Sequence, residues 1–283
     1  MDTLTLTWIG HSTFLIQIGG LNVLTDPMWS EFASPVRVIG PRRYTAPGIA
    51  LDELPPIDLV VQSHDHYDHL DLPTVGALAR RSPDAEWLAP LGLSRWLEQR
   101  GIRRVRELDW WDEADVAALR VGAVPAQHFS GRGPRRNRAL WCGWTLQAAA
   151  SDRAVYFVGD TGFFPSFGEI AERRGPFDAV LMPIGAYDPR WFMRPAHLDP
   201  EEAVRAYEAI AFKQSGRPLH FVAMHWGTFK LTEEPLLEPA ERLRSEWTRA
   251  ALPVPLLHVL RHGETRQIAA NAREGADYPP PGA

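Results

Sequence analysis

The 283-residue chain contains a single cysteine, Cys142, and no long run of apolar residues. One cysteine excludes an intrachain disulfide and a metal cage built from thiolates, and it is typical of a reducing compartment. No apolar segment approaches the roughly 20 residues that a membrane-spanning helix requires. The N-terminal residues MDTLTLTWIG lack the basic segment and the apolar core of a signal peptide. These absences predict a cytoplasmic protein.

An excess of positive charge is also missing. The net charge is -5 and the isoelectric point is about 6.1, so the bulk charge does not favour a nucleic-acid partner. The sequence has no tandem repeat and no clear linker, although its length would allow one large domain or two small ones. We therefore expect one domain over residues 1–270 and a disordered tail over residues 271–283.

Three of the ten histidines fall within one short segment, SHDHYDHLD, at residues 63–71. This segment places His64, His66, Asp68 and His69 within six positions. On a helix, residues 64 and 68 share a face and residue 66 does not, whereas on a strand residue 69 points away from the other three. A strand that breaks into a turn can bring all four side chains around one centre. A polar surface loop would also accommodate them, but this concentration of metal-capable groups favours a metal site.

Four ligands in one turn cannot all bind a single tetrahedral ion without strain. Two adjacent ions are the natural solution, in which His64 and His66 face one ion while Asp68 and His69 face the other. Each ion then needs further ligands from elsewhere in the chain.

Three more polar side chains follow predicted apolar strands. They are His128 in VPAQHFS, Asp160 in VYFVGDTG and His225 in FVAMHWGTF. An unpaired polar group at such a position would be costly. Taken alone, each is best interpreted as a hydrogen-bonded turn residue. Together with the cluster, they supply the missing ligands.

Apolar periodicity and turn residues predict alternating strands and helices. We expect a β-hairpin over residues 4–27, a long loop over 30–56 and a buried strand over 57–64 that ends at the cluster. Further strands are predicted at 86–90, 105–110, within 115–149, and at 153–162, 177–187 and 219–229. Helices are predicted at 72–81, 93–101, 167–175, 199–210 and 238–250. The segment GRGPRRNR interrupts the strands of 115–149, and residues 255–268 are predicted to form a final strand pair.

The pattern HxHxDH, followed by a lone histidine, an aspartate in GDTG and a late histidine, resembles the metallo-β-lactamase superfamily. The segments WIGHSTFLIQ, LTDPMWS, GPRRY, PIGAYDPRWFM, HLDPEEAV and HWGTF are similar, more closely, to the N-acyl-phosphatidylethanolamine-hydrolysing phospholipase D family, from Trp8 to about Glu238. The resemblance implies an α/β (α+β) fold, a four-layer αββα sandwich of two mixed β-sheets flanked by helices. It places the ions at one edge, among the loops at the strand ends.

The resemblance also implies a complete set of metal ligands. One ion would be held by His64, His66 and His128, the other by Asp68, His69 and His225, with Asp160 bridging the two. Imidazole and carboxylate ligands favour Zn²⁺ as the divalent ion, and they leave Fe and Mn open.

The activity that the resemblance implies is that of a binuclear metal-dependent hydrolase. A metal-bridged hydroxide would attack a small-molecule or lipid phosphodiester, for example a phospholipid of the N-acyl-phosphatidylethanolamine type. Asp68 would both ligate an ion and orient the hydroxide. His197, in MRPAHLDPEEAV, would contact the substrate phosphate or the leaving oxygen, although a histidine bonded to backbone at a helix start is an equal alternative.

The residues leave other functions open. The same site could open a lactone or cleave RNA, or the protein could bind metal without turnover. Peripheral contact with a membrane is compatible with the sequence. Five apolar residues could line an acyl chain, and core packing would explain each of them as well: Trp29, Phe32, Trp191, Phe192 and Met193.

Residues around these ligands carry smaller expectations. Asp26 and Asp65 are candidates to fix the ligand imidazoles through hydrogen bonds, although either could simply cap a turn. His11 is expected to be structural and Cys142 to lie in the core. His262, in VLRHGET, is expected to be exposed on a turn between strands.

Overall fold

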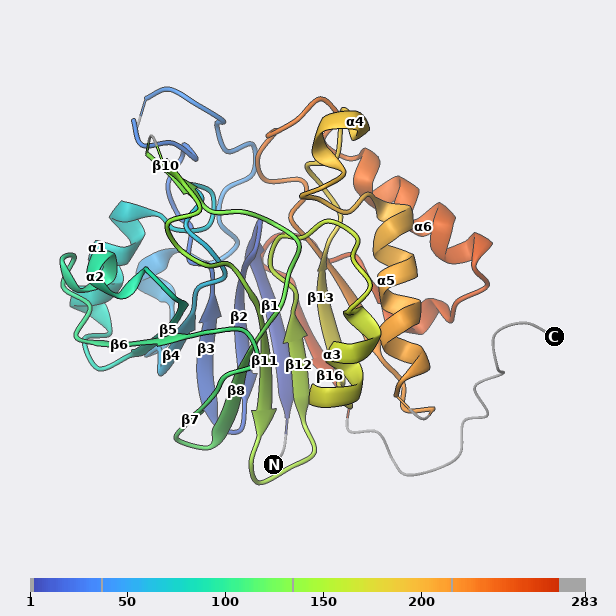
Figure 1. Cartoon of the computed structure of the whole chain (residues 1–283), viewed down its shortest axis with the longest axis horizontal. Helices are drawn as coiled ribbons and strands as arrows, with labels where there is room; N and C mark the ends of the chain where they lie inside the picture. Colours follow the sequence, from blue (N-terminus) through green and yellow to red (C-terminus); the bar gives the residue numbers. More distant parts are fainter. Residues whose placement is uncertain (1–2, 37, 134, 215, 270–283) are drawn as a thin grey trace.

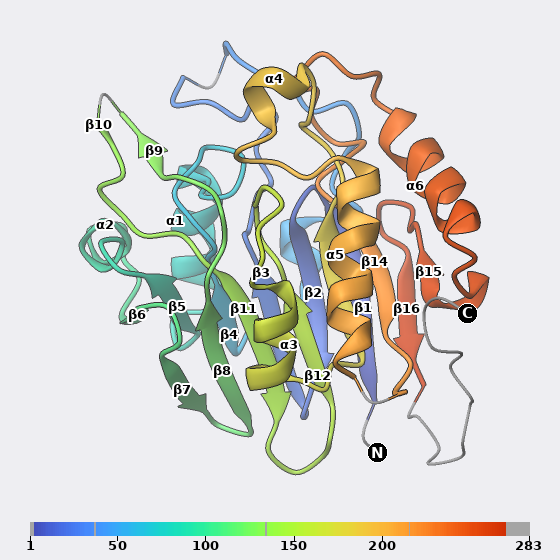
Figure 2. The same ribbon diagram turned by 45° about the vertical axis from the view of Figure 1, so that its right-hand side comes forward.

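The computed structural model describes residues 3–36, 38–133, 135–214 and 216–269. The tail expected to be disordered, residues 271–283, lies outside this range. Two mixed β-sheets of seven strands each pack face to face, and helices cover their outer faces (Figures 1 and 2). This arrangement confirms the four-layer αββα fold.

The first sheet contains the N-terminal strands and one strand from the C-terminal region. Its order is β16 (Thr265–Ile268), β1 (Leu4–Gly10), β2 (Thr13–Ile18), β3 (Leu21–Thr25), β4 (Leu59–Val61), β5 (Glu86–Pro90) and β6 (Arg104–Leu108). Pairing is antiparallel from β16 to β3 and parallel from β3 to β6. Helices α1 (Leu72–Arg81) and α2 (Ser94–Glu98) pack on its outer face.

The second sheet repeats this mixture of pairings. Its order is β15 (Leu257–His258), β14 (His220–Met224), β13 (Ala179–Pro183), β12 (Ala154–Phe157), β11 (Gly143–Ala148), β8 (Leu119–Val124) and β7 (Glu113–Val116). Helices α3 (Phe167–Arg174), α5 (Pro200–Phe212) and α6 (Glu238–Arg249) cover its outer face (Figure 2). The short helix α4 (Arg190–Met193) lies at the top of the molecule in Figure 1.

Alternation along the strands explains why two sheets pack on each other. In β2, Phe14 and Ile16 point into the core between the sheets, whereas Leu15 points to the outer core beneath α1. A period of two residues puts successive side chains on opposite faces, and both faces of this sheet are covered. Cys142 is buried in the core between the sheets, as expected.

The strand ends determine where the polar residues meet. Strands β4, β8, β12 and β14 all run toward the upper edge in Figure 1, so the loops that follow them lie together between the tops of the two sheets. In sheets with parallel strands, the crevice outside the carboxyl ends is the usual place for a ligand. The candidate site is built from these loops.

The structure corrects several predictions. Residues 255–268 form two strands that do not pair with each other, because β15 joins β14 while β16 crosses over to β1. The segment GRGPRRNR is more than an interruption, since it forms a small hairpin of β9 (Gly131–Arg132) and β10 (Arg135–Arg136). His262 is not exposed: its ring packs 4.2 Å from that of Trp8, and its Nε2 lies 2.7 Å from Thr228 Oγ1. The turn between β15 and β16 folds back over Trp8, which the local sequence does not reveal.

One glycine allows the loops that follow β13 and β14 to pack closely against each other. A Cβ added to Gly185, just after β13, would lie 2.2 Å from the carbonyl oxygen of His225. We expect Gly185→Ala to lower the free energy of unfolding by about 1–3 kcal/mol, because the backbone around His225 must shift. Gly76→Ala in α1 is the matched control, since only Arg80 Nη1, at 3.8 Å, is near. That control should gain up to about 1 kcal/mol of helix stability. Urea denaturation measures both, and equal effects would contradict the prediction.

Candidate metal centre

The turn after β4 gathers a first group of three imidazoles. His64 Nε2 lies 2.9 Å from His66 Nδ1, and His128 Nε2, from the loop after β8, lies 3.2 Å from the same atom. These nitrogens approach one another closely enough to bind one ion. The structure therefore brings together the three residues predicted for the first ion.

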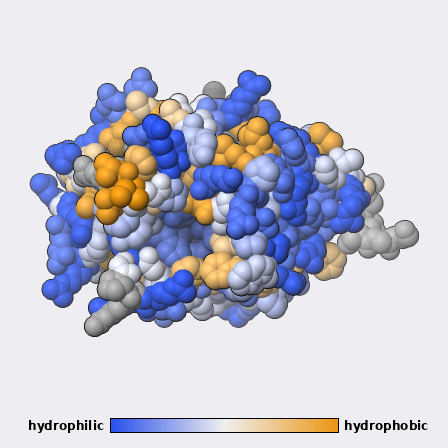
Figure 3. Space-filling view, turned by 90° about the horizontal axis from the view of Figure 1, so that it is seen from above, coloured by the Kyte–Doolittle hydropathy of each residue, from blue (hydrophilic) through white to orange (hydrophobic). Residues whose placement is uncertain are grey.

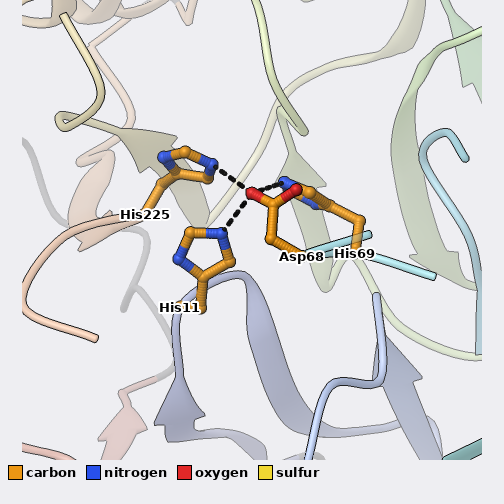
Figure 4. Close-up of side chains that lie close together, drawn as sticks. All are labelled: His11, Asp68, His69 and His225. Atoms are coloured by element: carbon orange, nitrogen blue, oxygen red, sulfur yellow. Dashed lines mark hydrogen bonds and ion pairs between the residues drawn. The ribbon is translucent and has the colours of Figure 1, made fainter. Parts of the chain in front are cut away.

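A second group lies beside the first and contains two carboxylates. Asp68 Oδ2 is 3.3 Å from His69 Nε2 and 3.5 Å from His225 Nε2 (Figure 4). Asp160 Oδ2 is 3.2 Å from the His69 atom and 3.1 Å from the His225 atom. Two ligand atoms on a tetrahedral ion are about 3.3 Å apart when each bond is about 2.0–2.1 Å long. These four separations match that spacing, so the four atoms suit the binding of one ion.

Asp160 lies between the two groups. The same oxygen that contacts the second group, Oδ2, is 3.9 Å from His64 Nε2 and 3.8 Å from His128 Nε2. Asp160 is buried, and its other oxygen, Oδ1, has no hydrogen-bond partner among the residues that the structure describes. One carboxylate facing two groups of ligands is the arrangement that a bridging ligand requires.

Hydrogen bonds on the far side of the rings orient three of the imidazoles. His69 Nδ1 donates to Asp26 Oδ2 at 2.7 Å, and His128 Nδ1 donates to the carbonyl of Ala196 at 2.9 Å. His64 Nδ1 lies 2.8 Å from Ser63 Oγ, which in turn donates to Asp26. Such contacts fix the tautomer that presents the opposite nitrogen to a metal. Asp26 thus has the position expected of it.

Asp65 lies in a different place from the one expected. Its Oδ1 accepts the N–H of Gly131 at 2.7 Å, and its carbonyl accepts a bond from Arg132. Arg132 also donates to the carbonyl of Leu70 and stacks between the rings of Tyr67 and Trp96. Asp65 and Arg132 therefore fasten the β9–β10 hairpin to the ligand turn, and neither contacts a ligand imidazole.

The donor set fits divalent metal ions. His69 Nε2 and His225 Nε2 are buried and have no hydrogen-bond partner within the described part of the chain. An unpartnered buried nitrogen is costly, and a bound ion removes that cost. The groups offer nitrogen and oxygen ligands in the number that two ions need.

Electrostatics around the second group are strong. Burial alone would lower the pKa of His225, but the carboxylates of Asp160 and Asp68 raise it to about 9 when no ion is bound. The same carboxylates hold the pKa of His69 well above its usual range despite burial. Burial would raise the pKa of Asp68 and Asp160, but the neighbouring imidazoles hold both well below the usual range.

His197 reaches the rim of this centre. It lies between α4 and α5, with Nδ1 3.9 Å from Asp160 Oδ2 and its ring 5.1 Å from that of His128. Its Nδ1 has no hydrogen-bond partner among the described residues, so the ring is not bonded to backbone through that atom. Burial lowers its pKa to about 4, which leaves the imidazole neutral near pH 7. His197 thus offers a neutral ring next to the predicted ligands.

His11 is the site residue that the sequence interpretation missed. It was expected to be structural, yet its Nε2 lies 2.9 Å from Asp68 Oδ2, beside His69 and His225 (Figure 4). Its position between Gly10 and Ser12, in a tight turn joining two strands, was the only available signal. His220 and His258 lie outside this centre, and their rings contact each other, with Nδ1 of His220 2.8 Å from Nε2 of His258.

Comparison with known proteins agrees with this geometry. A model of the β-lactamase superfamily domain matches residues 21–226. The chain belongs to the metallo-β-lactamase superfamily. Within this superfamily it is 46% identical to an uncharacterised protein of Mycobacterium tuberculosis, over 89% of this chain and 67% of that protein. It is 39% identical to N-acyl-phosphatidylethanolamine-hydrolyzing phospholipase D 1 of Caenorhabditis elegans, over 84% of this chain and 68% of that protein. This chain thus spans about two thirds of the length of these two relatives.

Solved structures show the same fold. A metallo hydrolase of Ignicoccus hospitalis superposes with a TM-score of 0.69, over 95% of this chain and all of that chain, at 24% identity. The family and the relatives named as hydrolases identify this protein as a metal-dependent hydrolase with the metallo-β-lactamase fold. In the part of the chain that the structure describes, every helix is too short or too polar to cross a membrane.

The pKa shifts predict that metal binding releases protons. An ion that binds His69 and His225 must displace the protons that Asp160 and Asp68 stabilise there. Because the carboxylates raise the pKa of His225 to about 9 and that of His69 well above its usual range, the apparent affinity for Co²⁺ should increase as the pH rises from neutral to mildly alkaline values. Titration calorimetry in two buffers of different ionisation enthalpy measures the released protons. Affinity that is independent of pH, with no proton release, would contradict this.

Proposed function

We propose that the protein is a binuclear phosphodiesterase of the phospholipase D type, acting on a lipid phosphodiester such as an N-acylated phosphatidylethanolamine. One observation carries the proposal: Asp160 Oδ2 lies between two complete groups of ligand atoms. The identity to the nematode phospholipase D supports the lipid substrate.

The ions assigned to the two groups would be Zn²⁺, or alternatively Fe or Mn, and all seven predicted residues would hold them. They are His64, His66, Asp68, His69, His128, Asp160 and His225. When bound, such a pair lowers the pKa of a shared water and accepts the charge that develops on the phosphoryl oxygens. In such a hydrolysis, the oxygen of a water molecule would bond to phosphorus while the phosphorus–oxygen bond to the alcohol breaks, and the alcohol would leave with a proton.

His197 and Asp68 are the residues proposed to handle substrate and protons. Asp68 accepts hydrogen bonds and is held ionised by its imidazole neighbours, so it orients the attacking water. His197, a neutral imidazole in the wall of the site, donates a hydrogen bond to a phosphoryl or leaving oxygen. Arg190 Nη1 donates to the carbonyl of His197 at 2.9 Å and keeps this segment against the centre.

A cavity next to the ligand turn provides room for the rest of a substrate. It has a volume of about 400 Å³, and its wall includes Phe32, Tyr67, Leu72 and Trp96 together with Arg100. The lining also includes Arg132 and the carboxylates of Glu31 and Asp71, so an amphipathic substrate would meet apolar surface and charges of both signs there. Lactones and RNA, the alternative substrates, would use these features less fully, because a lactone carries no phosphate and RNA would meet a protein of net charge -5.

Substitutions at two neighbouring positions test the proposal. Asp160→Asn should lose bound metal and hydrolysis together, because it removes the bridging charge. His197→Ala should keep both ions while kcat on a lipid diester falls by about 10²–10⁴-fold, as expected for loss of a proton-handling group. Elemental analysis and a panel of N-acyl-phosphatidylethanolamine micelles, a soluble diester, a lactone and RNA measure this. Unchanged metal and activity in Asp160→Asn would refute the bridge, and inactivity of the metallated parent across the panel would favour a non-catalytic module.

The face that carries the site also exposes apolar side chains, which we propose contact a lipid surface. Trp191 and Phe192 of α4 are 84% and 61% exposed, and Ile39 in the loop before β4 is 70% exposed. Both segments lie at the top of Figure 1, and the view onto that end shows a polar hollow with apolar patches beside it (Figure 3). Core packing is therefore ruled out for Trp191 and Phe192.

Vesicle binding tests this surface. The double substitution Trp191→Ala and Phe192→Ala should reduce sedimentation with vesicles of mixed neutral and anionic phospholipid, while hydrolysis of a soluble diester stays the same. Phe212→Ala is the control, because Phe212 is 67% exposed at the C-terminal end of α5, away from α4. Equal vesicle binding by the parent and the double variant would contradict a role of α4 in lipid contact.

A further inference from the structure

His11 occupies a position where both sheets and the ligand turn meet. It is 1% exposed, lies between β1 and β2, and has a φ of 54°, in the left-handed region that side chains other than glycine rarely adopt. Its side chain points at Asp68, and the distance from Nε2 to Oδ2 is 2.9 Å (Figure 4). A residue held in such a conformation suggests that its surroundings over-determine it.

The backbone of His11 is fastened on both sides. Its N–H donates to Thr228 Oγ1 at 2.7 Å, and its carbonyl accepts the N–H of His225 at 3.1 Å and the indole N–H of Trp8 at 2.9 Å. His225 follows β14 in the second sheet, whereas His11 belongs to the first. The orientation of the His11 ring is therefore coupled to the loop that carries His225.

Two observations separate a hydrogen-bond donor from a metal ligand. The distance of 2.9 Å from His11 Nε2 to Asp68 Oδ2 is that of an N–H···O hydrogen bond, and it is shorter than the 3.1–3.5 Å separations within the second group. Asp68, His69, His225 and Asp160 already offer four ligand atoms to the second ion without His11.

The Nδ1 atoms of the rings also separate His11 from three of the predicted ligands. His64, His69 and His128 have a partner for the nitrogen that faces away from the centre, whereas His11 Nδ1 has none among the described residues. A ring that donates through Nε2 carries no proton on Nδ1, so it needs no acceptor there. His225 Nδ1 also lacks a described partner, so for that residue the assignment rests on the distances.

We propose that His11 is a positioning residue whose Nε2–H donates to Asp68 Oδ2 and holds that carboxylate at the second metal site. The inference rests on the proposed binuclear site but not on its substrate. Its effect acts through Asp68, which is the group that would touch the ion. Contacts of this kind, one step removed from a metal, change metal affinity by about 10–100-fold when removed.

Two substitutions separate the N–H from the ring. His11→Phe keeps an aromatic ring against Phe229, whose centroid is 5.3 Å away, and loses the donor. His11→Gln loses the ring and keeps an amide donor at similar reach. In Co²⁺ titrations of the metal-free full chain, followed by absorbance and calorimetry, His11→Phe should bind the second ion about 10–100-fold more weakly. His11→Gln should stay close to the parent, and the first ion should be unaffected in both.

The control is His258→Phe, a buried histidine outside the centre, which should leave both affinities unchanged. Thermal unfolding of the ion-free variants verifies that each one is folded. Equal weakening in His11→Phe and His11→Gln would overturn the proposal, as would a change in the Co²⁺ spectrum that shows a lost nitrogen ligand. No substrate is used, so two bound ions with no hydrolysis across the panel would refute the proposed function and leave this inference standing.

Discussion

The burial of two carboxylates among imidazoles is the constraint on which the upper edge of this protein depends. Asp160 and Asp68 lie within 4 Å of nitrogens from five separate segments of the chain. Removing such charges from water is expensive unless each one is paired. The contacts between these carboxylates and the histidine nitrogens bring strand ends from both sheets to one place. The same side chains form the two groups of candidate metal ligands.

Four of the eight non-glycine residues with positive φ in the described part of the chain lie at the same edge. Among the described residues, His11, Asp26 and His225 adopt positive φ angles, and so does Ala186, whose neighbour Gly185 touches the His225 carbonyl. Each such conformation costs about 1–3 kcal/mol and persists where the surroundings enforce it. Hydrogen bonds from Ser63 to Asp26 and from His225 to His11 provide that enforcement. Strain and site thus share one cause, which is the need to aim polar side chains inward at strand ends.

Fold and chemistry are separate levels in this protein. Solved relatives below 25% identity share the two-sheet scaffold, and a scaffold of this kind supports many reactions. Three features surround the ligands of this chain: the cavity bounded by Tyr67 and Trp96, the Arg132 stack that fastens the β9–β10 hairpin, and the exposed aromatic residues of α4. These features influence which diester can reach the centre, whereas the two groups of metal ligands determine which reaction the centre can support.

The sequence by itself determined the ligand residue types and the strand ends that carry them, because alternation and turn residues are local signals and the HxHxDH spacing is compact. Only the tertiary structure decided how distant segments meet. The contact of His11 with Asp68 spans 57 positions, β15 and β16 separate into different sheets, and His262 packs on Trp8. Each of these depends on long-range pairing that no local pattern encodes. The packing of the two sheets therefore places His11, which no sequence pattern marks as a site residue, next to the predicted metal ligands.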